Sequence, residues 1–288
     1  MSKTVEVHVT GKCEYKCVFC SVNKHPLSEP SSEQIKKDID LTEDFSRITF
    51  TGGEPILRKD LIDLVRYAHR IHNRILIETH GFGLTTSCIK KLIDAGVTEI
   101  KLSCHSHNKK VYYKTTRNKK SFEIMFEALK NLKAFSDKLE VETNTVITRY
   151  NANSLTKTVE WINKNFPFVK KIRISYPRFY PIKGNENYCK KYILPLPNLR
   201  KEFKKIINLK NNKVFFENVP LCVANLPSPK YFSWELYLFI NGKITKGWDE
   251  RYYPDKCNLC SKKELCQGIH KYYASYFKPN FIKPFKNF

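Results

Sequence analysis

Short apolar segments alternate with longer segments of helical periodicity over the first 180 residues, and this alternation limits the folds that are open to the chain. Strands that alternate with helices form a parallel sheet with crossover helices. In parallel sheets and barrels, the functional residues gather at the carboxyl ends of the strands. The sequence therefore predicts an α/β fold with a functional site at that end of the sheet.

The predicted elements follow one another at regular intervals. Strand segments show β-branched residues and alternation, whereas helical segments repeat their apolar residues every three to four positions. We expect strands from near residue 4, at 47–51, 74–79, 99–103, 139–147 and 171–175, and helices from a capping box at Ser31, at 59–72, from Thr85 or Thr86 to Gly96, from Ser121 to Leu132, and at 154–164.

Three cysteines follow the first predicted strand directly. Cys13, Cys17 and Cys20 have C-x3-C-x2-C spacing, which places three thiols in one loop at the carboxyl end of a strand. Three thiolates leave a tetrahedral metal with an open position, and they leave one iron of a four-iron cluster free for an outside ligand. At this point a zinc knuckle that lacks one ligand and three unrelated buried thiols remain alternatives.

A second motif follows the next predicted strand. Thr51-Gly52-Gly53-Glu54-Pro55 has two glycines at a strand end, where the backbone can approach a ligand closely. The carboxylate of Glu54 is a candidate for binding an amino group. Taken alone, the motif is an ordinary turn.

Together, the C-x3-C-x-aromatic-C and Gly-Gly-Glu-Pro motifs resemble those of the radical S-adenosylmethionine (SAM) enzymes, over roughly residues 4–180. The resemblance implies a partial (β/α)6 barrel in which Cys13, Cys17 and Cys20 hold a [4Fe–4S] cluster and SAM chelates the open iron. Reduction of SAM would release a 5′-deoxyadenosyl radical that abstracts hydrogen from a substrate. It also implies a low-potential electron donor of the flavodoxin or ferredoxin type. The residues that the resemblance assigns to SAM are Gly52, Gly53, Glu54, Pro55, Ser103 and Asn144.

For other strand-end residues, the sequence indicates more than one possible role. Glu78-Thr79-His80-Gly81 resembles the family's Thr-Asn-Gly segment, with His80 in place of the asparagine. His105 is a loop histidine or a substrate contact, and Arg173 could meet a carboxylate. No catalytic residue is assigned beyond the cluster. Three further cysteines are expected to be small apolar fillers: Cys88, Cys104 and Cys189.

A second cysteine set lies near the carboxyl terminus. Cys257, Cys260 and Cys266 have C-x2-C-x5-C spacing, and Cys222 lies upstream. Four thiolates can close a [4Fe–4S] cluster or a structural zinc site. The pattern resembles the SPASM and twitch auxiliary-cluster domains of radical SAM enzymes, shortened to one cluster.

The expected organisation has three parts. A radical SAM barrel spans residues 1–180, and a connecting helix and edge segment spans 181–215, with an edge strand at 214–216. A small twitch-like iron–sulfur domain spans 216–288 and contains a hairpin with strands at 234–240 and 243–245, turned by Asn241-Gly242.

Composition restricts partners and compartment. The net charge of +23 is compatible with a nucleic-acid partner. Lysine greatly outnumbers arginine, however, and the basic pairs are scattered, so nucleic acid is not the favoured substrate. No segment approaches the roughly 20 apolar residues of a membrane helix, and no signal region is visible. We therefore expect a cytoplasmic protein without a membrane partner.

The expected function is radical modification of a peptide or protein side chain, by analogy with SPASM and twitch enzymes. Because the first strand starts near residue 4, no leader-peptide-binding domain is expected before the barrel. The alternatives are a tRNA- or nucleotide-modifying enzyme, an enzyme that modifies a small molecule such as a cofactor, and a non-catalytic metal-binding adaptor.

Overall fold

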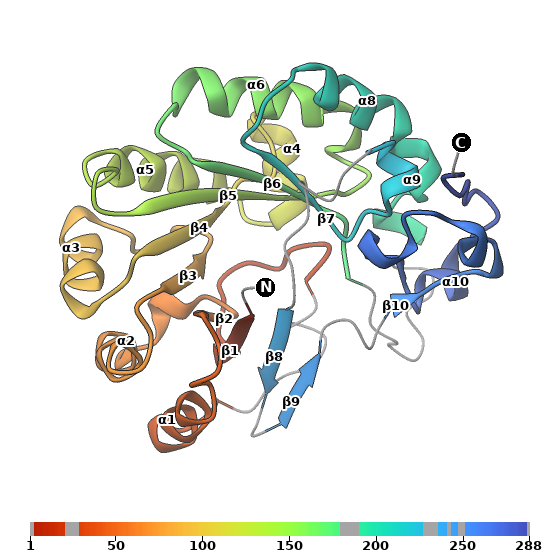
Figure 1. Cartoon of the computed structure of the whole chain (residues 1–288). Helices are drawn as coiled ribbons and strands as arrows, with labels where there is room; N and C mark the ends of the chain where they lie inside the picture. Colours follow the sequence, from red (N-terminus) through yellow and green to blue (C-terminus); the bar gives the residue numbers. More distant parts are fainter. Residues whose placement is uncertain are drawn as a thin grey trace.

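A computed structural model describes residues 3–20, 29–178, 190–226, 236–240, 243–246 and 251–286. Its centre is a curved sheet whose strands follow the order β7-β6-β5-β4-β3-β2-β1-β8-β9, with helices along the outer face (Figure 1). Strands β1 to β7 are all parallel. The predicted α/β class is therefore confirmed.

The observed elements agree closely with those predicted. The strands are β1 (Thr4–Thr10), β2 (Arg47–Gly52), β3 (Ile75–Thr79), β4 (Glu99–Ser103), β5 (Glu140–Val146), β6 (Lys171–Ser175), β7 (Val214–Glu217), β8 (Leu236–Ile240), β9 (Lys243–Lys246), β10 (Arg251–Tyr252) and β11 (Ile269–His270). The helices are α1 (Ser32–Asp40), α2 (Leu61–His69), α3 (Thr86–Ala95), α4 (Lys109–Thr116), α5 (Ser121–Lys133), α6 (Leu155–Asn165), α8 (Arg200–Asn208), α9 (Leu221–Ala224) and α10 (Tyr273–Tyr276).

Two helix boundaries show how local sequence sets these elements. The Ser31 hydroxyl accepts a hydrogen bond from the backbone N–H of Gln34 and so caps α1, as predicted. The Gln34 side chain donates to Asp38 instead of reaching back, so only half of the capping box forms. Helix α3 ends at Gly96, whose φ of 113° lies in the left-handed region.

Helix α4 was not predicted. Its sequence is mostly polar and basic, and Tyr112, Thr115 and Thr116 are its buried residues. The helix begins after Asn108, whose side-chain oxygen accepts from the backbone N–H of Val111. Tertiary packing of Tyr112, rather than apolar periodicity, stabilises this helix.

The two faces of the sheet differ in chemistry. The outward-facing residues of the strands, such as Val5, Ile100 and Ile172, are fully buried against the helices. The alternate, inward-facing positions carry charged residues such as Lys101 and Arg173. Strands of parallel sheets that are buried on both faces are normally apolar throughout. The polar interior therefore marks the inside of the barrel as a surface for function.

The chain beyond residue 213 adds strands to both edges of the sheet. Strand β7 is the predicted edge strand, and it pairs with β6. Strands β8 and β9 form the predicted antiparallel hairpin, whose turn residues 241–242 lie outside the described residues. Strand β8 also pairs in parallel with β1, with Thr4 opposite Leu236, which the sequence did not predict.

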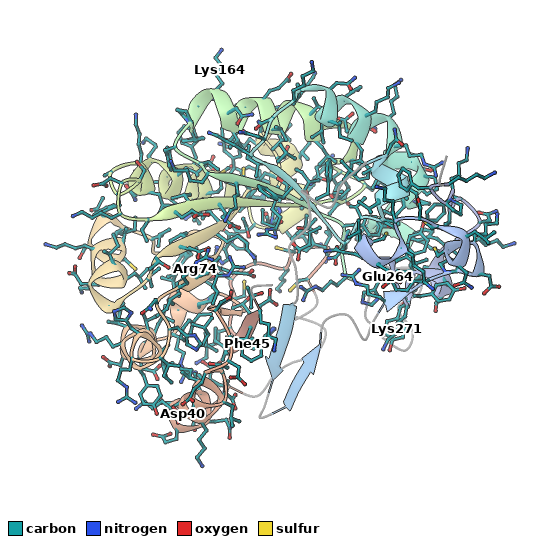
Figure 2. All side chains as sticks on the ribbon, in the orientation of Figure 1. Asp40, Phe45, Arg74, Lys164, Glu264 and Lys271 are labelled. Atoms are coloured by element: carbon teal, nitrogen blue, oxygen red, sulfur yellow. The ribbon has the colours of Figure 1, made fainter. Side chains whose placement is uncertain are left out.

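The outer surface is rich in lysine. Two of these lysines, Lys164 on α6 and Lys271 between β11 and α10, project away from the body of the molecule (Figure 2). Within the described residues, no helix is both long and apolar enough to cross a membrane.

Candidate active site

A cavity of about 260 Å³ opens at the carboxyl ends of the parallel strands. All three cysteines of the first motif line it, and Gly52 and Gly53 line it as well. Ser103 from the end of β4 and Asn144 from β5 complete the predicted part of the wall. Glu54 and Pro55 lie outside this lining. The strand-end location follows from the parallel topology, which brings residues distant in sequence to one edge.

The cysteine loop is held by the unpredicted helix α4. The backbone N–H groups of Lys16 and Val18 donate to the carbonyl oxygens of Thr116 and Thr115, at 3.2 and 2.9 Å. The backbone N–H of Cys20 donates to the carbonyl of Cys17 at 3.1 Å. The loop conformation is thus fixed by backbone contacts, and the thiols are left to face the cavity.

The three thiols influence one another electrostatically. Burial raises the pKa of Cys13 to about 12. Burial also raises the pKa of Cys17 well above its usual value, and the neighbouring Cys20 and Cys13 add to this effect. Thiolates in this loop therefore need a compensating cationic group. Such a group would be a metal centre, because metals bind the deprotonated thiol.

The sulfur positions separate a single metal ion from a larger cluster. Tetrahedral zinc with Zn–S bonds of ~2.3 Å would place its sulfur ligands ~3.8 Å apart. Within the described residues, no three cysteine sulfurs lie within 4.8 Å of one another. Among the described residues, neither cysteine set therefore has three sulfurs at the spacing of a single zinc ion.

The two glycines allow the cysteine loop to lie against β2. A Cβ on Gly53 would lie 2.1 Å from the carbonyl oxygen of Lys12, and one on Gly52 would lie 2.3 Å from that of Thr10. Gly52 also has a φ of 138°. The backbone N–H of Glu54 donates to the Lys12 carbonyl at 2.7 Å. The motif therefore positions the residue that precedes Cys13.

The Glu54 side chain is engaged within the protein. It is fully buried, and its carboxylate accepts from Thr79 Oγ1 at 2.7 Å and from the backbone N–H groups of His80 and Ile56 at 2.8 and 3.1 Å. Burial raises its pKa to about 7, against the opposing effect of these hydrogen bonds. A ligand amino group in the cavity would therefore meet the backbone at Gly52 and Gly53 before it met this carboxylate.

His80 links the cysteine loop to β3. Its Nε2 lies 3.1 Å from Glu14 and 3.2 Å from Glu54, and its ring stacks on Tyr15 with centroids 3.7 Å apart. Burial lowers the pKa of His80 to about 4. The ring is therefore neutral at pH 7, and an Nε2–H would donate to either carboxylate. An asparagine at this position, as in the family's Thr-Asn-Gly segment, could donate a hydrogen bond but has no aromatic ring to stack on Tyr15.

Further strand-end side chains line the cavity. His105 is 3% exposed, its Nδ1 accepts from the backbone N–H of Val146, and its ring meets Phe19 edge-on at 4.8 Å. Burial lowers the pKa of His105 to about 3. Asn144 Oδ1 accepts from Ser175 Oγ at 2.7 Å. Arg173 donates to the carboxylate of Glu142 at 2.9 Å and does not line the cavity.

The sequence analysis missed much of the cavity lining. The missed part consists of charged and polar residues of β1, β4, β6, β7 and the segments that follow β6 and β7. A signal was present, because polar residues occupy every second position of β1, β4, β5 and β6. The missed residues are Glu6, His8, Lys101, Ser175, Tyr176, Arg178, Glu217 and Asn218.

The C-terminal cysteines also come together. A small cavity of about 20 Å³ is lined by Cys222, Cys257, Cys260 and Cys266. Burial raises the pKa of Cys257 to about 11, and the nearby Cys222, Cys266 and Cys260 contribute. The upstream cysteine therefore joins the C-x2-C-x5-C set in space, as the sequence predicted.

The remaining cysteines differ in environment. Cys104 is fully buried in the hydrophobic core, and Cys88 packs against the core from α3. Both are fillers, as predicted. Cys189 lies outside the described residues.

Known sequences resemble parts of this chain. The mycofactocin maturase MftC of Mycolicibacterium smegmatis is 31% identical over 153 residues, which are 51% of this chain and 38% of the maturase. The GTP 3′,8-cyclase of Nautilia profundicola is 26% identical over 225 residues, 74% of this chain and 69% of the cyclase. The AdoMet-dependent heme synthase of Methanosarcina barkeri is 26% identical over 157 residues, 53% of this chain and 44% of the synthase. The chain thus spans less than two thirds of several of its relatives.

Solved structures share the fold. SuiB of Streptococcus suis bound to S-adenosylmethionine superimposes with a TM-score of 0.69 at 15% identity, over 100% of this chain and 76% of SuiB. HydG, a maturase of the [FeFe]-hydrogenase, gives a TM-score of 0.57 at 14% identity, over 75% of this chain and 51% of HydG. At these identities the likeness concerns the fold alone. The sequence model of the Radical SAM superfamily matches residues 7–162, more than half of the 288 residues, and the chain therefore belongs to the radical SAM superfamily.

Proposed function

We propose that this radical SAM enzyme holds its SAM-binding [4Fe–4S] cluster on Cys13, Cys17 and Cys20 and acts on a peptide or protein side chain. When bound, the cluster and SAM together supply the electron transfer and the 5′-deoxyadenosyl radical that abstracts hydrogen from a substrate. The observation that carries the assignment is the meeting of these three thiols and the Gly52–Gly53 backbone on one cavity wall.

The chain's own residues would position the reactants and exclude water. The backbone at Gly52 and Gly53 offers acceptors for the amino group of SAM. Ser103 and Asn144, on the same wall, offer polar atoms for its carboxylate or ribose. His80 and Tyr15 hold the cysteine loop against β3. Phe19 and His105 line the cavity together and contact each other edge-on, which would help to exclude water.

We further propose that Cys222, Cys257, Cys260 and Cys266 bind an auxiliary [4Fe–4S] cluster. Their convergence on one small cavity supports this assignment. The proposal includes a low-potential electron donor of the flavodoxin or ferredoxin type. It also includes a reducing, cytoplasmic setting, since every cysteine in the described residues is a free thiol.

The peptide assignment is supported by likeness over the full chain. SuiB bound to its precursor peptide SuiA superimposes over 100% of this chain with a TM-score of 0.67. A nucleotide substrate is the second candidate. It is favoured by the net charge of +23 and by the GTP 3′,8-cyclase match, which extends over 74% of this chain.

Iron content and SAM cleavage test the cluster assignments. After anaerobic reconstitution we expect about eight irons per chain in the wild type and about four in a Cys13/Cys17/Cys20→Ala triple variant. 5′-Deoxyadenosine should form in the wild type alone. A Cys222/Cys257/Cys260/Cys266→Ala variant should also hold about four irons. Four irons in the wild type together with bound zinc would contradict the auxiliary cluster, and no iron at all would contradict the whole proposal.

A further inference from the structure

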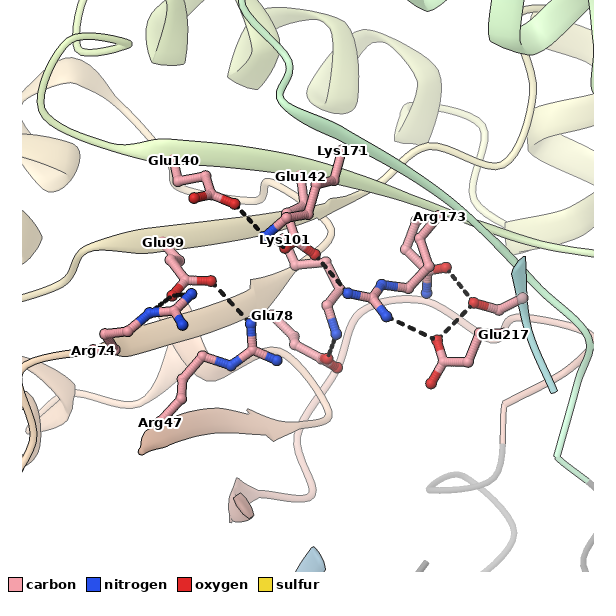
Figure 3. Close-up of polar contacts among 12 residues, drawn as sticks. Arg47, Arg74, Glu78, Glu99, Lys101, Glu140, Glu142, Lys171, Arg173 and Glu217 are labelled. Carbon is pink, nitrogen blue, oxygen red and sulfur yellow. Dashed lines mark hydrogen bonds and ion pairs between the residues drawn. The ribbon is translucent and has the colours of Figure 1, made fainter. Parts of the chain in front are cut away.

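The inside of the barrel carries a dense set of paired charges below the cysteine loop. Lys101 on β4 pairs with Glu78 on β3, and Arg173 on β6 pairs with Glu142 on β5 at 2.9 Å (Figure 3). Arg173 also lies 3.8 Å from Glu217 on β7. Buried charges are tolerated when they are paired and hydrogen-bonded. Most of this network meets that condition within the protein.

The cavity wall itself is not balanced. Among the residues that line the cavity, the carboxylates are Glu6, Glu78 and Glu217, whereas the lysine and arginine side chains are those of Lys101 and Arg178. Behind the wall, Glu142 pairs with both Lys171 and Arg173, at 3.0 and 2.9 Å. The wall therefore carries one more negative than positive side chain.

The imbalance is concentrated at Glu6. Glu78 accepts a hydrogen bond from Thr51 Oγ1 at 3.0 Å in addition to its pair with Lys101. Glu217 lies 3.0 Å from Ser175 Oγ and shares the proton of that hydroxyl with Asn144. These two carboxylates therefore have partners at hydrogen-bonding distance.

Glu6 has a weaker environment. Its carboxylate has one ion-pair partner in the described part of the chain, Arg178 at 3.6 Å, which is beyond hydrogen-bonding distance. The Glu6 side chain is 10% exposed. Burial raises the pKa of Glu6, and Arg178 opposes that shift only in part. A buried carboxylate without hydrogen bonds is costly unless a ligand supplies donors.

His8 lies on the same face of β1, two residues beyond Glu6, and also lines the cavity. Its Nδ1 is buried and has no hydrogen-bond partner in the described structure. Burial lowers the pKa of His8 to about 4, so the ring is neutral near pH 7 and offers an acceptor nitrogen. The Glu6 carboxylate therefore lies on the cavity lining beside a neutral imidazole that has an unpaired nitrogen.

The position of Glu6 separates it from the proposed SAM amino contact, whereas His8 pairs with Thr51 beside that contact. Strand pairing places Glu6 opposite Thr49, whereas Gly52 pairs with Thr10. Four residues of extended strand separate Glu6 from Thr10, or roughly 13 Å. An amino group held at Gly52 and Gly53 therefore does not reach Glu6.

We propose that Glu6 and His8 form a substrate subsite for a positively charged nitrogen group, an ammonium or a guanidinium such as that of a lysine or arginine side chain. Charge-assisted hydrogen bonds to the Glu6 carboxylate, with His8 as a second acceptor, would hold the group. This inference rests on the proposed function, because it assigns the substrate of the same cavity.

Binding of short peptides to the SAM-bound holoenzyme, without reductant, tests the subsite. The probes are acetyl-Gly-Gly-X-Gly-Gly-amides in which X is lysine, arginine, norleucine or glutamate, and the readout is the dissociation constant from calorimetry. Norleucine has a lysine-like chain without the charge. We expect the lysine or arginine peptide to bind at least tenfold more tightly than the norleucine peptide, about 1.4 kcal/mol.

Glu6→Gln should reduce that ratio to about twofold or less, because glutamine keeps the shape and removes the charge. The matched control is Glu43→Gln, at an exposed glutamate away from the cavity, which should keep the tenfold ratio. Equal binding of the charged and norleucine peptides by wild type overturns the proposal without any variant, as does an unchanged ratio in correctly folded Glu6→Gln.

A separate measurement keeps the two proposals distinct. If wild-type enzyme with reductant never forms 5′-deoxyadenosine, the proposed function fails whatever the binding ratio. If it forms 5′-deoxyadenosine but shows no preference for the cationic peptides, only the subsite is wrong.

Discussion

Substitution of Gly53 by alanine should disrupt the first cysteine site through a backbone clash. The added Cβ would lie 2.1 Å from the Lys12 carbonyl oxygen and 2.6 Å from its carbon. Ordinary contact begins near 3.4 Å, so the two backbones must separate by 3.4 − 2.1 = 1.3 Å. Cys13 follows Lys12 directly and moves with it. Ligand sites tolerate displacements of only about 0.5 Å.

The energetic cost combines two terms. Overpacking a fitted contact costs about 1–3 kcal/mol, and the hydrogen bond from the Glu54 N–H to the Lys12 carbonyl contributes about 1 kcal/mol more. We expect Gly53→Ala to lower the free energy of unfolding by about 2–4 kcal/mol. We also expect a loss of about four irons per chain after reconstitution, and SAM cleavage at least ~100-fold slower.

Gly96→Ala is the matched control. A Cβ there would lie 2.4 Å from His69 Cγ, at a φ of 113°, but far from the cysteine loop in sequence and structure. It should lower the free energy of unfolding by about 1–2 kcal/mol and leave the iron content unchanged. Urea unfolding and iron analysis of wild type, Gly53→Ala and Gly96→Ala measure the two effects. Wild-type iron content and SAM cleavage in Gly53→Ala would refute the argument that the glycine positions the loop.

Three further results follow from individual contacts. Thr79→Val removes the hydroxyl that donates to Glu54 at 2.7 Å and should lower the free energy of unfolding by about 1–3 kcal/mol, whereas a loss below 0.5 kcal/mol in urea titrations would contradict this role. Burial acts to raise the pKa of Glu217, but Arg173 and other cations outweigh it and lower that pKa from 4.5 to about 2. Ionised Glu217 therefore contributes to the free energy of unfolding above pH 4.5, and this contribution is lost as the pH falls toward 2. Between pH 5 and 2, the free energy of unfolding should fall by about 3 kcal/mol less in Glu217→Gln than in wild type, as measured by urea unfolding. Cys104→Ala should lower the free energy of unfolding by about 1 kcal/mol and should hold as much iron as wild type. Any loss of iron would show that this buried thiol is a ligand.

The fold was predictable because its strands and helices alternate with clear periodicity. The Thr85 cap and the Gly96 stop fixed α3 within a residue or two, and the outward-facing valines of β1 identified its buried face. Helix α4 escaped prediction because its stability comes from the packing of Tyr112 and not from an apolar stripe. The parallel pairing of β8 with β1 was not predicted, because local sequence does not show which distant strand will pair with an edge strand.

The site was predictable where short motifs carry chemistry. Cys13, Cys17, Cys20, Gly52 and Gly53 all reach the cavity. The charged wall was harder to find, because its members are single residues on separate strands. Their shared direction becomes evident only once the register of the sheet is known. Alternating polar positions in buried parallel strands are the physical signal for such a wall.

The pairing of β8 with β1 has a consequence for synthesis of the protein on the ribosome. Thr4 pairs with Leu236, which lies far along the chain, beyond the barrel sequence. The edge of β1 that faces β8 therefore has no partner strand until the hairpin has emerged from the ribosome. Such long-range pairing is intrinsically slow. Until it forms, β1 presents unpaired backbone groups beside the nascent cysteine loop, an edge that other chains could join. We therefore expect premature termination before β8 to yield an aggregating fragment, even though residues 7–162 contain the complete family match.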